Sequence, residues 1–144
     1  MNEVDEARAM LSMAEKNLRA LKGMDDATVF YDEIFGFHVQ QAIEKSLKAW
    51  IIAIGVESPF IHNLARLLAI LEENGCDVES FWDLVEYTAY AVTFRYDVAE
   101  MTDDPIDRPD ASEQAQRLYD HVEQLLNNAS TKASSEASQS ENDV

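Results

Sequence analysis

The sequence predicts an all-α protein, an up-down antiparallel bundle of four to five helices. Apolar residues recur at steps of three and four along several segments, which is the period of one face of an α-helix. Only four glycines and three prolines interrupt the 144 residues, 47% of which are hydrophobic, so one substantial core is possible. No segment alternates apolar and polar residues between turn signals, as a half-buried strand would.

The first two helices are expected at about residues 3–22 and 27–54. The first carries one apolar face and ends at Gly23. The second ends at Gly55 and has a second apolar row, so it should pack against more than one neighbour. We therefore expect the second helix to lie at the centre of the bundle.

The remaining helices follow the same periodicity. A third is expected in the block 61–71, a fourth from near residue 78 or 80 to at least Tyr96, and a fifth over roughly 110–128. The stretch 97–110 holds six acids, two prolines and one arginine, which is typical of an exposed connection. Short connections after the first three helices favour antiparallel neighbours.

The domain is expected to span residues 1–128. Residues 129–144 are mostly Ser, Ala, Asn and acidic residues without apolar periodicity, so the sequence predicts a disordered tail there.

Charge and composition disfavour several classes of partner. The formal charge of −17, from 28 acidic and 11 basic residues, opposes broad attraction to nucleic acid or to an anionic membrane surface. The longest apolar run, 49–56, is much shorter than the ~20 residues of a spanning helix. Residues 1–6 lack the pattern of a secretory signal, and Cys76 is the only cysteine, so we expect a cytoplasmic protein without disulfides.

Motifs for metals and cofactors are missing from the sequence. His38, His62 and His121 lie on three different predicted helices, without the paired spacing that places two metal ligands on one helix face. The sequence also contains no phosphate-binding loop, no Gly-x-Gly-x-x-Gly and no Gly-x-Ser-x-Gly. We therefore expect no metal and no cofactor, and no motif predicts an enzyme that acts alone.

An unusual polar group lies on the second predicted helix. His38, Gln41, Lys45 and Lys48 are separated by three, four and three residues, so they align along one face. In one interpretation the lysines are surface cations and Glu44 pairs with Lys48. In the other they face a groove and balance an anionic group such as a phosphate. Spacing alone favours the first interpretation and leaves both open.

Three further side chains can approach such a groove. His62, just after Pro59, can lie at its rim or cap local backbone. Arg95 follows a stretch low in charge, so its guanidinium must reach solvent, Asp97 or a bound anion. Tyr96 adds aromatic surface, which is more typical of a core than of a stacking platform.

Four groups of residues occur in a characteristic order along residues 3–128: Met10-Leu11 with Ala14-Glu15 and Leu18; the block from Phe37 to Ala49; Pro59 with His62-Asn63-Leu64 and Leu67-Leu68; and Phe94-Arg95-Tyr96-Asp97. Together they resemble the HEPN domain family (higher eukaryotes and prokaryotes nucleotide-binding). The most specific part is Gln-Gln-Ala-x-Glu-Lys-x-Leu-Lys-Ala, which begins at Gln40.

The resemblance implies a helical bundle, often dimeric, with one of two roles. Many family members are partners of a separate minimal nucleotidyltransferase, frequently in a toxin–antitoxin module. Others are metal-independent ribonucleases, whose Arg-x4-6-His motif is brought together across a dimer. No arginine here precedes a histidine with four to six residues between them; Arg117 and His121 are separated by three. This departure disfavours ribonuclease activity.

Taken with the polar residues above, the resemblance to this family implies a non-catalytic partner of a nucleotidyltransferase that binds a nucleotide, another anionic small molecule or a substrate, and that forms a homodimer. The groove is expected between the second, third and fourth helices. The expected ligand-binding residues are the polar and aromatic side chains that would face it: Gln41, Lys45, Lys48, His62, Arg95 and Tyr96. The lysines would balance phosphate charge, the arginine would offer a planar fork, the glutamine and histidine hydrogen bonds, and the tyrosine a stacking ring.

Two alternatives remain. One is a metal-independent HEPN ribonuclease toxin. The other is a pure protein-interaction module without a ligand, whose acidic surface would suit a basic partner.

Overall fold

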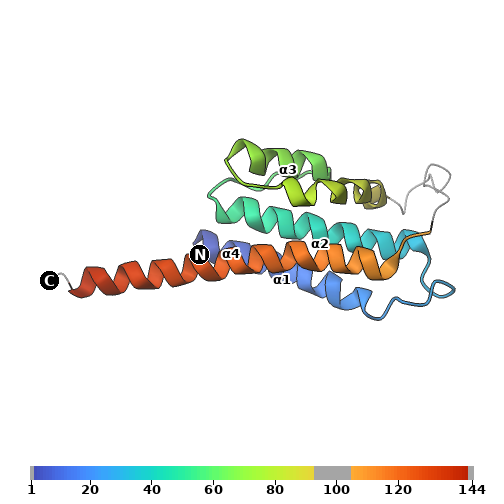
Figure 1. The fold of residues 1–144 in the computed structure, drawn as a ribbon, viewed down its shortest axis with the longest axis horizontal. Coiled ribbons are helices and arrows are strands. Elements are labelled where there is room, and N and C mark those ends of the chain that lie inside the picture. The colour runs from blue at the N-terminus through green and yellow to red at the C-terminus, as the bar shows by residue number, and fades with distance from the viewer. Residues whose placement is uncertain (1, 93–104, 143–144) are drawn as a thin grey trace.

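The protein is described by a computed structural model that covers residues 2–92 and 105–142 (Figure 1). Within these two ranges, every regular element is a helix. The elements are α1 Glu3–Leu21, α2 Asp32–Ala53, α3 Leu64–Glu73, the 3-10 helix η1 Glu79–Val92 and α4 Arg108–Asn142. The predicted all-α fold class is confirmed.

Local chemistry explains where the helices begin and end. The side chains of Asn2, Asn63 and Asp107 each accept a hydrogen bond from the backbone N–H three residues later, at 2.8, 3.1 and 3.1 Å. These bonds cap the first turns of α1, α3 and α4. Gly55 and Gly75 follow α2 and α3 with φ of 85°, a left-handed conformation that favours glycine. Capping side chains and glycines therefore account for the starts of α1, α3 and α4 and for the ends of α2 and α3.

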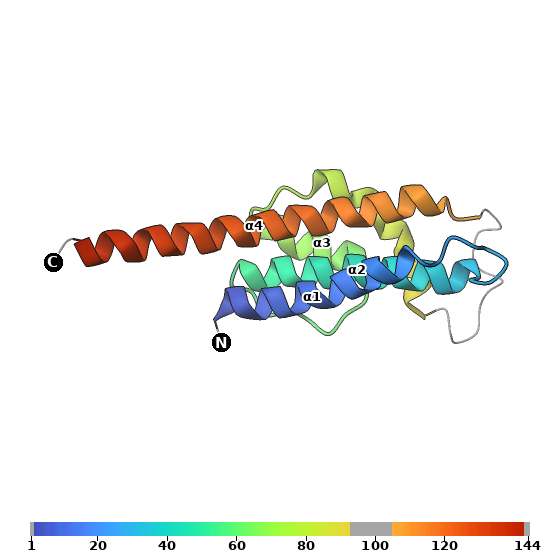
Figure 2. The same cartoon turned by 90° about the horizontal axis from the view of Figure 1, so that it is seen from below.

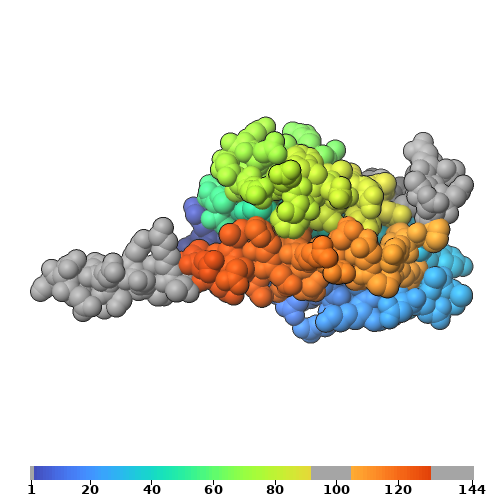
Figure 3. Space-filling view, viewed as in Figure 1, coloured from blue at the N-terminus to red at the C-terminus, as the bar shows by residue number. Residues whose placement is uncertain are grey.

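The second helix lies at the centre, as predicted, and contacts α1, α3, η1 and α4 (Figure 2). Every element adds an almost fully buried leucine to the core: Leu11, Leu47, Leu68, Leu84 and Leu118. Figure 3 shows α4 lying across one face of the molecule, between η1 and α1. The apolar rows of α2 are thus covered from several sides, which explains why they are wider than a single stripe.

Contacts near the two ends of α2 show in which direction η1 runs. Trp50, near its end, meets Phe81 of η1 with ring centroids 6.1 Å apart, and Gly36, near its start, lies against Tyr90 of the same helix η1. Therefore α2 and η1 are antiparallel. The connection 54–63 runs back along α2, however, so α3 follows the direction of α2 (Figure 1). This connection is long enough to bring the chain back along α2 before α3 begins, so α3 runs parallel to α2. A tight turn would have made α3 antiparallel to α2.

The last helix continues beyond the segment that the sequence assigns to it. The backbone remains helical to Asn142, past the end of the bundle, where a disordered tail is expected (Figure 1). Ala, Gln and Glu in this segment favour helix, and extending an existing helix avoids the unfavourable nucleation step. The division of the chain at residue 128 stays a prediction.

Close packing at Gly36 gives a stability prediction. A Cβ atom there would lie well inside van der Waals contact distance of the Tyr90 ring, closest to its Cδ1 atom. We expect Gly36→Ala to lower the free energy of unfolding by about 1–3 kcal/mol, measured by urea denaturation, because overpacking outweighs alanine's helix propensity.

A matched control is Gly23→Ala, whose Cβ would meet the Ala20 carbonyl oxygen at an ordinary 3.7 Å. It should change the unfolding free energy by less than about 0.5 kcal/mol. An unchanged urea midpoint for Gly36→Ala would show that the Tyr90 ring does not pack there.

Candidate functional site

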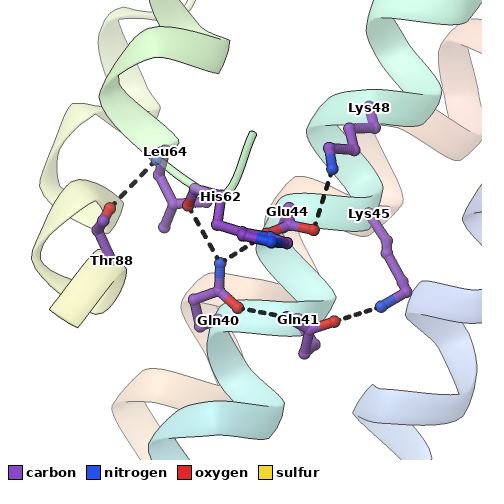
Figure 4. A network of polar contacts seen from close by, with 8 residues as sticks. All are labelled: Gln40, Gln41, Glu44, Lys45, Lys48, His62, Leu64 and Thr88. Atoms are coloured by element: carbon purple, nitrogen blue, oxygen red, sulfur yellow. Dashed lines mark hydrogen bonds and ion pairs between the residues drawn. The ribbon is translucent and has the colours of Figure 1, made fainter. Parts of the chain in front are cut away.

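Six polar side chains form a connected group where α2 faces the residues just before α3 (Figure 4). We call them the polar cluster: Gln40, Gln41, Glu44, Lys45, Lys48 and His62. Five of them lie on α2 at steps of one, three and four residues, so helical geometry places them near one another. The sixth, His62, is brought in by the returning connection 54–63.

Glu44 is the centre of the polar cluster, and its side chain is only 5% exposed. Its Oε1 atom accepts from Gln40 Nε2 at 3.0 Å and lies 2.8 Å from His62 Nδ1, while Oε2 accepts from Lys48 Nζ at 3.2 Å. Burial raises the pKa of this carboxyl, but the hydrogen bonds from Gln40 and His62 and the charge of Lys48 outweigh burial and lower the pKa overall. Glu44 is therefore a buried, ionised carboxylate.

Two side-chain amides link Lys45 to this carboxylate, and each hydrogen bond in the series is donated toward the carboxylate (Figure 4). Lys45 Nζ donates to Gln41 Oε1, and Gln41 Nε2 donates to Gln40 Oε1 at 2.6 Å. Gln40 Nε2 in turn donates to Glu44. Since each amide both accepts and donates, the bonds polarise one another toward the carboxylate.

The start of α3 is held between two helices. Gln40 Nε2 also lies 3.3 Å from the backbone oxygen of His62, and the Leu64 N–H donates to Thr88 Oγ1 of η1 at 3.2 Å (Figure 4). His62 is thus fixed through both its ring and its backbone.

The predicted site residues fall into three environments. The Glu44–Lys48 pair is present, but it is buried: the Lys48 side chain is 11% exposed. Gln41 and Lys45 are half-buried, whereas the His62 side chain is 65% exposed. The other two predicted residues, Arg95 and Tyr96, lie outside the described residues.

Lys45 and His38 are both affected by burial. Burial lowers the pKa of the Lys45 ammonium, and the Glu44 charge partly opposes this shift. His38 shares the predicted helix face, yet its Nδ1 atom lies 3.1 Å from Asn17 Oδ1 of α1. Burial lowers the pKa of this imidazole. His38 therefore joins α2 to α1 instead of joining the polar cluster.

Sequence reasoning did not identify Gln40 and Glu44 as the centre of the site. Gln40 is fully buried although it is a large polar residue. The available signal was a pair of polar residues four positions apart on a helix, each preceded by an apolar residue, Val39 and Ile43.

Arg108 is a second buried polar centre, beside the start of α2 (side chain 8% exposed). Its guanidinium donates to the backbone oxygens of Met24 and Phe30 and, at 3.0 Å, to Asp32 Oδ1. It also lies 4.7 Å from the ring centroid of Phe35. The expected exposed connection therefore contains a buried arginine that joins α4 to the segment before α2.

Arg117 and His121, the nearest approach to a ribonuclease motif, each contact other residues of the protein. Arg117 pairs with Glu113 at 2.7 Å on the surface of α4. The His121 ring lies 4.8 Å from Trp50 and 5.3 Å from Phe81, between ring centroids. The two side chains are thus engaged in different local interactions.

Two kinds of feature are missing from the parts of the chain that the structure describes. None of the helices in 2–92 and 105–142 combines the length and the apolar character that a membrane span requires. The same residues hold no group of three or more His, Cys, Asp or Glu side chains placed to bind a metal ion.

Comparison with known proteins agrees with this fold. The crystal structure of TT1696 from Thermus thermophilus superimposes with a TM-score of 0.63 and 29% sequence identity, covering 86% of this chain and 98% of that one. No curated protein matches the sequence significantly. The model of the HEPN domain matches residues 7–132, most of the chain. With the helical bundle and the α2 motif, this match shows that the protein belongs to the HEPN domain family.

Proposed function

We propose that this HEPN protein is a non-catalytic module that binds a nucleotide or a similar anionic small molecule as the partner of a nucleotidyltransferase. The observation that most supports binding is the environment of Lys45. Its half-buried ammonium donates to the neutral amide of Gln41, while the nearby Glu44 carboxylate already receives three other donors. A phosphate oxygen would give this cation the counter-charge that an amide does not supply.

The polar cluster also offers the other groups that a nucleotide requires. His62 is exposed beside the buried carboxylate, and Gln41 lies between Lys45 and the centre of the polar cluster. The charge of Lys48 is already paired with Glu44. Its main role in this proposal is therefore to hold Glu44 in place, and direct phosphate binding is secondary. Arg95 and Tyr96 complete the proposed set.

The non-catalytic role is supported by the sequence. The Arg-x4-6-His spacing of HEPN ribonucleases is missing from all 144 residues. The partner role follows the many HEPN proteins that act beside a separate minimal nucleotidyltransferase, frequently as a toxin–antitoxin pair. We propose the same role for this chain, as a homodimer in the cytoplasm. A nucleotidyltransferase encoded in the neighbouring reading frame would support this part of the proposal.

Substitution of Lys45 tests the binding site. We expect Lys45→Ala to weaken binding of a ribonucleoside triphosphate about tenfold or more, because a hydrogen bond to a charged group contributes about 1.5–3 kcal/mol. The measurement is isothermal titration of the parent and the variant with each of the four triphosphates.

Lys16→Ala, which removes an exposed lysine of α1, is the control and should bind like the parent. The proposal is contradicted if none of the four nucleotides binds the parent, or if Lys45→Ala binds as tightly as the parent. Cleavage of RNA by the purified parent without added metal would contradict its non-catalytic part.

A further inference from the structure

The ring of His62 is held by one nitrogen and exposed elsewhere. Its Nδ1 atom lies 2.8 Å from Glu44 Oε1, while the side chain is 65% exposed. An ionised carboxylate can only accept hydrogen bonds, so the hydrogen in this contact belongs to Nδ1. The second ring nitrogen, Nε2, is then the acceptor of the neutral imidazole.

Glu44 is itself fixed before any ligand arrives. Gln40 and Lys48 donate to its two oxygens, and Gln40 also contacts the backbone oxygen of His62. Lys48 alone would give the buried carboxylate a counter-charge. The bond to an exposed imidazole is therefore additional, and its physical effect is to select the ring's tautomer and orientation.

We propose that His62 Nε2 accepts a hydrogen bond from a hydroxyl group of the bound ligand, such as a sugar hydroxyl of a nucleotide, and that Glu44 is the positioning residue for this contact. The inference rests on the proposed function for the existence of a ligand and adds the part of the ligand that His62 recognises. A neutral Nε2 acceptor cannot bond to an unprotonated phosphate oxygen, because both are acceptors. Phosphate is instead the group that suits Lys45.

The tautomer is tested in the ligand-free protein by the 15N chemical shifts of the His62 ring, at a pH where the ring is neutral. The parent should show the hydrogen on Nδ1. Glu44→Gln should shift the population toward the Nε2–H form, which a free imidazole prefers. A parent ring that carries its hydrogen on Nε2 overturns the inference and leaves the proposed nucleotide site standing.

The ligand contact is tested by isothermal titration with ribonucleoside triphosphates and their 2′,3′-dideoxy counterparts. The parent should bind the dideoxy form about three- to tenfold more weakly, as expected for one neutral hydrogen bond. His62→Ala should remove this difference. Lys45→Ala should weaken both forms equally and preserve it.

Each failure has a distinct pattern. Equal binding of the two forms by the parent, or a difference that survives in His62→Ala, overturns this inference alone. If neither form binds the parent, the inference and the proposed function both fail.

Discussion

Replacing Arg108 with alanine is expected to lower the free energy of unfolding by about 3 kcal/mol, because it removes a buried cation that pairs with the half-buried Asp32 and donates several hydrogen bonds. The change leaves the backbone oxygens of Met24 and Phe30 and the Asp32 carboxylate without their guanidinium donor. It also removes the cation above the Phe35 ring. Urea denaturation of the parent and the variant measures the effect.

Arg117→Ala is the matched control, since it removes an arginine of the same helix whose ion pair with Glu113 is exposed. It should change the unfolding free energy by about 0–1 kcal/mol. Equal effects of the two substitutions would mean that Arg108 does not hold α4 against the segment before α2.

Replacing Glu44 with alanine should also cost about 3 kcal/mol, because the Lys48 ammonium stays largely buried without its counter-charge. The double variant Glu44→Ala/Lys48→Met should lose less, since it leaves no unpaired charge. Glu15→Ala, which breaks the exposed pair with Arg19, is the control and should change stability by less than about 1 kcal/mol. Urea denaturation of all three variants tests the expectation, and a loss no larger than that of Glu15→Ala contradicts it.

The stabilisation that the Glu44 carboxylate contributes should decrease as the solution is acidified. The folded protein lowers the pKa of Glu44 below its ordinary value of 4.5, so the carboxylate's stabilisation is fully present above that pH. It is lost as the pH falls through the lower, folded pKa. The stability difference between the parent and Glu44→Ala, measured by urea denaturation, should therefore narrow as the solution is acidified through this range.

The polar face of α2 shows what periodicity can predict. Steps of three and four correctly place Gln41, Lys45 and Lys48 near one another, because helical geometry depends only on the local chain. Helical periodicity could not predict which of these polar side chains are buried. The depth of Glu44 and its contact with His62 depend on the path of residues 54–63, which is set by tertiary packing.

Arg108 illustrates a different limit. Its hydrogen-bond partners lie more than 70 positions earlier in the sequence, so no local pattern connects them. The acids around it are typical of an exposed connection, and the neighbouring Asp107 and Asp110 are indeed exposed. The available signal was a lone cation among acids at the start of a helix, and this signal does not specify an inward orientation.

The central position of α2 affects how any mutational scan of this protein must be interpreted. Of its 22 residues 13 are buried, and the same helix carries five members of the polar cluster. Random substitutions there will often reduce the amount of folded protein in the cell as well as any ligand affinity. Functional scores along this helix therefore need normalisation against protein abundance at each position, whereas scores for the exposed His62 can be interpreted more directly.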